Sequence, residues 1–173
     1  MIQGANSSFL HLDNATEPGQ GVTLNALSIN PPQFASQLPL WQEMRHGGLP
    51  LQSFWVAAGI PSTENAKEII AGLRDLGIEH VAFKPGSVDA IRQVCSIAAA
   101  NPDFPIILQW TGGRAGGHYS AEDFHQLILA TYSRIRRNAN ISLVAGSGFG
   151  SADDFWPYLS GDWRVDKFGV EPV

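Results

Sequence analysis

The sequence predicts an α/β fold in which parallel strands alternate with helices. An apolar strand pattern, a turn rich in glycine or proline, a helix-capping hydroxyl and an amphipathic helix follow one another four times. Apolar residues make up 44% of the 173 residues and charged residues 16%, which is typical of a globular domain with a hydrophobic core. Parallel neighbours are expected because each crossover of about a dozen residues or more contains a helix.

The segment before these repeats is less regular. Residues 1–20 are polar and aperiodic, which predicts a flexible lead-in. The sequence GVTLNALSI, residues 21–29, alternates between apolar and polar positions and predicts a strand that Pro31 and Pro32 end. A short helix is expected over residues 40–46, because Gly47 and Gly48 follow it.

Four strand, turn and helix units make up the rest of the chain. Their strands are expected at residues 54–58, 80–83, 105–110 and 141–145. The four helices are expected to begin after Ser62 or Thr63, after Ser87, after Ser120 and after Ser151. After Ser120, Glu122 and Asp123 would lie in the first turn of a helix, where negative charge suits the helix dipole.

All loops that follow parallel strands lie at the same edge of the sheet. The segments GIPS, KPGS, TGGRAGGHYS and GSGFGS should therefore gather at the carboxyl ends of the strands. Ligands bind at this edge in open α/β sheets and in (β/α)8 barrels alike. The pattern does not separate these two architectures, although a complete barrel typically needs about 250 residues.

Two glycine-rich loops are candidates for ligand contacts. GSGFG, residues 146–150, lies between a strand and a helix start, so that its amides could hold a phosphate; the alternative is a tight turn with close helix packing. In TGGRAGGHYS the glycines allow the backbone to lie against a flat ligand, and His118 could act as a general acid. The alternative is that His118 only hydrogen-bonds its own loop.

Lys84 and Asn25 are the other polar candidates. Lys84 ends an apolar strand, where a cation could stabilise a phosphate or a developing anion; simple solvent exposure is the alternative. Asn25 lies within a strand, facing either the ligand or a neighbouring hydrogen-bond partner. His125 is expected to pack beneath the glycine loop, and Cys95 to be an inert residue of the core.

Charge and composition exclude several classes of protein. The net charge is -5 and no basic cluster exists beyond Arg134, Arg136 and Arg137, which argues against nucleic-acid binding. A single cysteine cannot form an intramolecular disulfide, and no apolar run approaches the roughly 20 residues of a membrane span. The N-terminus lacks the pattern of a secretory signal, so that a cytoplasmic protein is expected.

Four longer segments carry a resemblance to a known family. They are GVTLNALSINP, FKPGSVDAI, NPDFPIILQWTGGRAGGHYSAEDFH and SRIRRNANISLVAGSGFGSADDFWPYLSGDW. Together they resemble the enoyl reductase domain in the beta subunit of fungal-type fatty acid synthase, from Gly21 to Phe168. The wider superfamily includes nitronate monooxygenases and bacterial flavin-dependent enoyl reductases.

The resemblance implies a (β/α)8 barrel that binds FMN, accepts hydride from NADPH and reduces an enoyl thioester on acyl carrier protein. His118 matches the proposed proton donor to the α-carbon of that substrate. The residues expected to contact the flavin or its phosphate are Asn25, Lys84, Gly116, Gly117, Gly146, Ser147 and Gly148. Acyl carrier protein and other synthase domains or subunits are the partners that the resemblance implies.

Two family features are not found in this sequence: an opening strand with a V-P-G-M-T-P type loop, and a later strand ending in F-G-S-R. A partial barrel is therefore expected over residues 21–173, with weak or no FMN binding by the isolated chain. The alternatives are a nitronate monooxygenase-like flavin oxidase and a non-catalytic fragment of a barrel.

Overall fold

The computed structural model of the protein describes residues 20–27, 31–57, 59–113, 120–146 and 149–161. Except for residue 20, the predicted lead-in lies outside this part of the chain. The described elements are β1 (Val22–Leu27), α2 (Pro31–His46), β2 (Leu51–Ala57), α3 (Thr63–Asp75), β3 (His80–Phe83), α4 (Val88–Ala100), β4 (Ile106–Trp110), α5 (Phe124–Ile135), β5 (Ile141–Ala145) and α6 (Ala152–Ser160).

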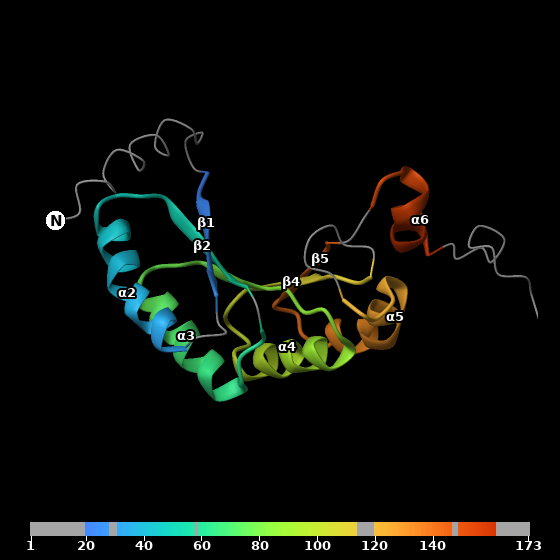
Figure 1. The fold of residues 1–173 in the computed structure, drawn as a ribbon, viewed down its shortest axis with the longest axis horizontal. Helices are drawn as coiled ribbons and strands as arrows, with labels where there is room; N and C mark the ends of the chain where they lie inside the picture. The colour runs from blue at the N-terminus through green and yellow to red at the C-terminus, as the bar shows by residue number, and fades with distance from the viewer. Residues whose placement is uncertain (1–19, 28–30, 58, 114–119, 147–148, 162–173) are drawn as a thin grey trace, which may run out of the picture.

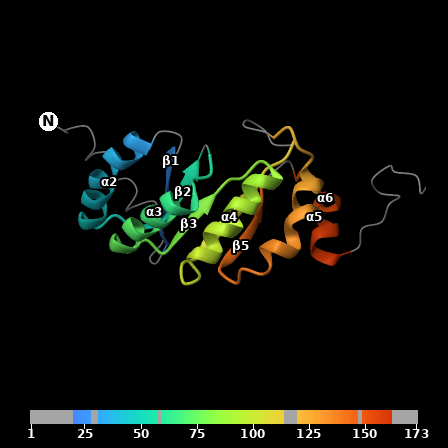
Figure 2. The ribbon, with the colours of Figure 1, turned by 90° about the horizontal axis from the view of Figure 1, so that it is seen from below.

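The five strands form one sheet whose spatial order, β1-β2-β3-β4-β5, is their order in the sequence. All four neighbouring pairs are parallel. Helices α2 to α5 lie along one face of this sheet, and the sheet curves so that its other face is concave and open (Figures 1 and 2). A doubly wound sheet would carry helices on both faces, whereas a barrel carries them only outside. The structure therefore confirms the α/β class and is consistent with the predicted partial barrel.

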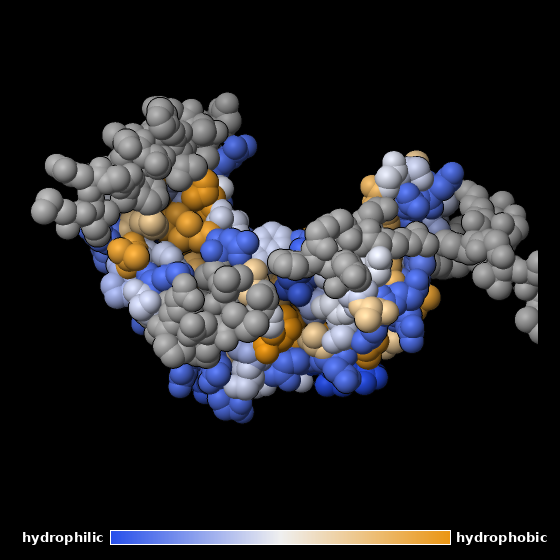
Figure 3. Space-filling view, in the orientation of Figure 1, coloured by the Kyte–Doolittle hydropathy of each residue, from blue (hydrophilic) through white to orange (hydrophobic). Residues whose placement is uncertain are grey.

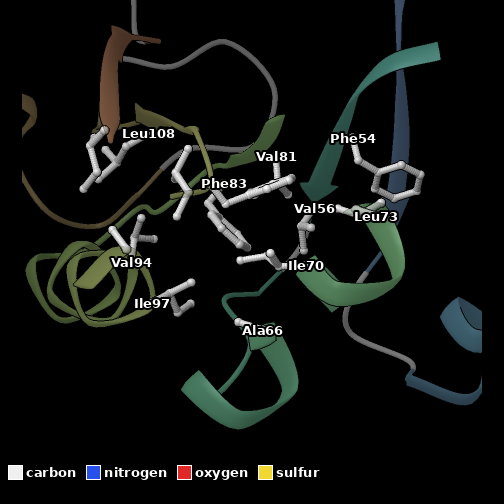
Figure 4. Packing of buried hydrophobic residues seen from close by; sticks show 14 of the residues in the cluster. Phe54, Val56, Ala66, Ile70, Leu73, Val81, Phe83, Val94, Ile97 and Leu108 are labelled. Atoms are coloured by element: carbon white, nitrogen blue, oxygen red, sulfur yellow. The ribbon is translucent and has the colours of Figure 1, made fainter. Parts of the chain in front are cut away.

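Alternation along the strands separates a helix-covered face from the open face. Phe54 pairs with Val81, and Val56 with Phe83, and all four side chains are buried beneath the helices. Figure 4 shows them packed against Ala66, Ile70 and Leu73 of α3 and Val94 and Ile97 of α4. At alternate positions of the strands, Trp55 and Ile107 are only half-buried, and Asn25 and Ser142 are exposed. The hydrophobic core thus lies between sheet and helices.

Three of the predicted helix caps are confirmed. Ser62 Oγ accepts a hydrogen bond from the Asn65 amide at 3.2 Å, and Ser87 Oγ accepts one from the Ala90 amide at 3.1 Å. Ser151 begins α6, where it forms a capping box with Asp154. Each cap satisfies a backbone donor that has no partner within its helix.

The predicted cap at Ser120 is wrong. Helix α5 begins at Phe124, and the Asp123 carboxylate caps it by accepting from the amides of His125, at 2.9 Å, and Gln126, at 3.2 Å. Ser120 lies upstream of this cap, and its hydroxyl donates to the carbonyl of Gly86 in the preceding unit. The helix therefore starts later than predicted.

The first helix and the first two strands also differ from their predicted bounds. Helix α2 begins at Pro31 rather than at residue 40, and β2 begins at Leu51 rather than at residue 54. Proline is compatible with the first turn of a helix because the N–H that it lacks has no helical partner there. Pro31, which was expected to end the strand, is therefore the first residue of helix α2. Strand β1 ends at Leu27, and residues 28–30 lie outside the described part.

Cys95 lies on the inner face of α4 and is 2% exposed. Burial raises the pKa of its thiol, and the nearby positive charge of Arg134 lowers it by a smaller amount. A buried thiol with a raised pKa holds little reactive thiolate near neutral pH, as expected for a core residue.

The packing of the covered face gives a direct test of the core. Leu108 on β4 is fully buried, whereas Leu129 on the outer face of α5 is 60% exposed. We expect Leu108→Ala to lower the free energy of unfolding by about 2–5 kcal/mol, because it removes buried methyl groups and leaves a cavity. The matched control Leu129→Ala should change it by less than about 0.5 kcal/mol. Urea denaturation measures both; equal losses would contradict the assignment of the two faces.

Candidate ligand site at the carboxyl edge of the sheet

The carboxyl ends of all five strands meet at one edge, and the candidate site lies where the open face of the sheet reaches that edge. The space-filling view shows the molecule hollowed between the side that carries β1 and β2 and the side that carries α6 (Figure 3). Of the predicted site residues, the structure describes Asn25, Lys84 and Gly146. Gly116, Gly117, His118, Ser147 and Gly148 lie outside the described residues, and their roles stay predictions.

Lys84 directly follows β3 and is half-buried. Because Phe83 points into the covered core, alternation places Lys84 on the open face. The described part of the chain contains one ion pair, between Arg92 and Asp89, so that Lys84 has no carboxylate partner there. A half-buried cation without a counter-ion, at the edge where ligands bind, suits an anionic or carbonyl-rich ligand.

Asn25 is exposed and lies on the open face of β1. It pairs with Trp55 of β2, and Trp55 pairs with Ala82 of β3, immediately before Phe83 and Lys84. The structure therefore places Asn25 and Lys84 on one face, two strands apart.

Gln109 belongs to the site although the sequence analysis did not single it out. It follows Leu108, which pairs with Phe83, so that Gln109 and Lys84 are neighbours on adjacent strands and share the open face. The signal in the sequence is a polar residue between the buried Leu108 and Trp110, at the same strand level as Lys84. Finding it requires the register between β3 and β4, which the sequence alone does not specify.

Gly146 lies close to the side chain of Gln109. A side chain added at Gly146 would coincide with the side-chain amide of Gln109. The backbone N–H of Gly146 donates to the Trp110 carbonyl at 3.0 Å. A larger residue at position 146 would thus require the Gln109 side chain to move, while the role of Gly146 in phosphate binding stays a prediction.

The end of the GSGFG segment already binds a carboxylate. The amides of Gly150 and Ser151 donate to Asp154 Oδ2 at 3.0 and 2.9 Å, and the hydroxyl of Ser151 donates to the same oxygen at 3.1 Å. These donors suit an anion, but they serve the N-terminus of α6 itself. A phosphate in this loop would have to use the amides that precede them.

An aromatic cluster holds the segment in place. Phe149 packs edge-on against Phe124 at 5.1 Å between ring centroids and against Tyr158 at 5.7 Å. Trp110 stacks on Phe124 at 5.1 Å, so that the end of β4, the start of α5 and α6 form one unit. His125 Nδ1 lies 2.5 Å from the Tyr158 hydroxyl, which confirms that this histidine packs within the structure.

The glycine-rich loop after β4 begins with two glycines that differ in their surroundings. A side chain at Gly112 would come within 2.7 Å of the backbone nitrogen of Phe124, whereas one at Gly113 would meet no atom closer than 3.5 Å. Neither residue has the left-handed φ that would by itself require glycine. Gly112 is therefore needed for the close approach of α5 to the end of β4.

The described residues place several hydrogen-bond donors on the open face. Lys84 and the side-chain amides of Gln109 and Asn25 lie there. No group of three or more metal-ligating side chains occurs among the described residues. In the same part of the chain, no helix has the length and apolar character needed to span a membrane.

Comparisons with known proteins find similarity to fatty acid synthases. The model of the family described as fatty acid synthase subunit beta/Fas1-like, helical, matches residues 105–173. Fatty acid synthase 2 of Mycosarcoma maydis is 58% identical over 153 residues, which cover 88% of this chain and 4% of the relative. The fatty acid synthase beta subunits of Schizosaccharomyces pombe and Saccharomyces cerevisiae are 57% and 50% identical, over 90% and 91% of this chain and 7% and 8% of their own lengths. The chain thus spans less than a tenth of the length of these curated relatives.

The two adjacent glycines give a matched pair of variants. Gly112→Ala should lower the free energy of unfolding by about 1–3 kcal/mol, because the backbone of Phe124 cannot move aside without shifting α5. Gly113→Ala meets only ordinary contacts and should change it by less than about 0.5 kcal/mol. Thermal or urea unfolding measures the difference, and similar values for both variants would contradict the close approach at Gly112.

Proposed function

We propose that the chain is a short segment of a fungal fatty acid synthase beta subunit and that it supplies part of an FMN-dependent enoyl reductase site. The observation that carries this proposal is Lys84, half-buried beside Gln109 on the open face at the carboxyl edge. FMN binds at this edge in the barrel that the sequence resembles. When bound, FMN would relay hydride from NADPH to the β-carbon of a trans-2-enoyl thioester.

The residues of this chain would bind and orient the reactants. Lys84 and Gln109 lie on adjacent strands and would donate hydrogen bonds to the carbonyl-rich part of the flavin. Asn25, on the same face, would contact the ring or its ribityl chain. The lysine charge would also stabilise negative charge that develops on the ring as it accepts a hydride.

His118 is proposed as the proton donor to the α-carbon. An imidazole with an ordinary pKa near 6.5 can hold and release a proton at neutral pH. The proposed phosphate site is formed by Gly146, Ser147 and Gly148, and its amide donors would be those of Ser147 and Gly148 because the Gly146 amide donates to Trp110. Gly116 and Gly117 would lie against the flavin.

The same proposal includes the partners and the location. The substrate would arrive on acyl carrier protein, other synthase domains or subunits would complete the assembly, and the protein would be cytoplasmic. All of the curated relatives named above are fatty acid synthases, which favours an enoyl reductase over a nitronate monooxygenase.

The role of His118 is tested in the full-length synthase. We expect His118→Ala to lower NADPH oxidation in the presence of crotonyl thioester by about 10²–10⁴-fold, because a general acid is lost. Flavin absorbance should remain, since the proton donor does not hold the cofactor. The control His46→Ala removes an exposed histidine at the end of α2 and should leave turnover unchanged. Normal turnover by His118→Ala would remove this residue from the mechanism.

Flavin binding by the isolated chain is a separate test. In the described structure, β1 and β5 each pair on one side only, and the open face is not enclosed. We therefore expect weak binding or none, because a flavin on this face would keep much of its surface in water. Quenching of flavin fluorescence on titration with the purified chain measures the affinity. A purified chain that carries stoichiometric FMN would contradict this expectation.

A further inference from the structure

The loop after β3 and the loop after β4 are joined by a network of hydrogen bonds centred on Ser120 and Glu122. The Ser120 hydroxyl donates to the Gly86 carbonyl and accepts from the Glu122 amide at 2.9 Å. One carboxylate oxygen of Glu122 accepts from the Val88 amide at 3.1 Å. The Glu122 carbonyl accepts from the Gly113 amide at 3.0 Å. Two residues thus connect backbone positions in both loops.

The hydrogen bond from the Val88 amide explains why residue 122 is a glutamate. Val88 is the first residue of α4, where backbone N–H groups have no helical partner and the helix dipole is positive. Ser87 already satisfies the Ala90 amide of the same helix. Glu122 therefore acts as a second cap, supplied by the next β/α unit from 34 residues away. A cap from another unit fixes the distance between the two units as well as the helix end.

The two loops joined by this network contain residues of the proposed enoyl reductase site. Lys84 lies two residues before Gly86, in the turn that Ser120 contacts. The other loop leaves the described structure at Gly113 and returns at Ser120, and both of these residues bond to Glu122. We propose that Ser120 and Glu122 are positioning residues that set Lys84 relative to the described ends of the β4–α5 loop. This inference rests on the proposed enoyl reductase function.

The same geometry indicates that the network can be broken without unfolding the chain. The Thr111 amide donates to the Pro85 carbonyl at 3.1 Å, which continues the pairing of β3 with β4 independently of Glu122. The Ser87 and Asp123 caps of α4 and α5 also remain. Removal of Glu122 should therefore loosen the two loops while the sheet and helices stay formed.

The experiment compares Glu122→Ala, Glu122→Gln and Ser120→Ala with the control Glu68→Ala, an exposed glutamate on α3. In the full-length synthase, Glu122→Ala and Ser120→Ala should keep bound flavin and the KM for crotonyl thioester but lower kcat by about 10-fold, because orientation is lost. Glu122→Gln should recover most of kcat, since its amide oxygen can still accept from Val88. Glu68→Ala should match the wild type.

Hydrogen exchange in the isolated chain measures the network without any cofactor. The amide of Val88, which bonds to the Glu122 side chain, should exchange faster in Glu122→Ala than in Glu68→Ala, while those of the sheet stay protected. Faster exchange together with an unchanged kcat would overturn the positioning role and leave a purely structural contact. Unchanged exchange would overturn the network itself.

His118→Ala in the same synthase separates failure of this inference from failure of the proposed function. Loss of turnover in His118→Ala but not in Glu122→Ala overturns the positioning role alone. Normal turnover in both variants removes His118 from the mechanism and overturns the positioning role. Loss in both, with recovery in Glu122→Gln, supports the inference.

Discussion

Burial of one face of the sheet beneath helices α2 to α5 is the constraint on which the rest of the structure depends. Every second residue of the inner strands must be large and apolar to fill this layer, as Val56, Phe83 and Leu108 do. The residues between them are then free of the core, and polar side chains can occupy them. The concave face and its polar edge are thus a consequence of covering only one side of a parallel sheet.

The pattern of the sequence was sufficient for the element order and for two strands at their observed bounds, residues 80–83 and 141–145. Such strands are short apolar runs between clear turn signals, which local sequence specifies well. The choice between an open sheet and a barrel was beyond the pattern, because both repeat the same unit. It depends on which face each crossover covers, and the consecutive strand order with a single helical layer is consistent with a partial barrel.

The site was predicted less completely than the fold. Lys84 and Asn25 could be proposed because they interrupt or end apolar strands, but Gln109 gains its significance only from its register with Lys84. Glycines are ambiguous in a different way. The sequence indicates a close approach to the backbone but does not show which group approaches it. At Gly112 the neighbour is the start of α5, and at Gly146 it is the side chain of Gln109. Close approach to the backbone of α5 therefore explains Gly112, whereas the neighbour of Gly146 is a flexible side chain.

Glu122 shows why loops at the edge of such a sheet cannot be interpreted one at a time. In the sequence, an acid shortly before a helix suggests favourable charge at the N-terminus of that helix. In the structure Asp123 caps α5, and Glu122 serves α4, the preceding helix. Ser120 makes a related contact before α5 begins, because its hydroxyl donates to the Gly86 carbonyl in the turn that precedes α4. Because the turn after Lys84 and both described ends of the β4–α5 loop share this network, the geometry of the candidate site belongs to two adjacent β/α units together.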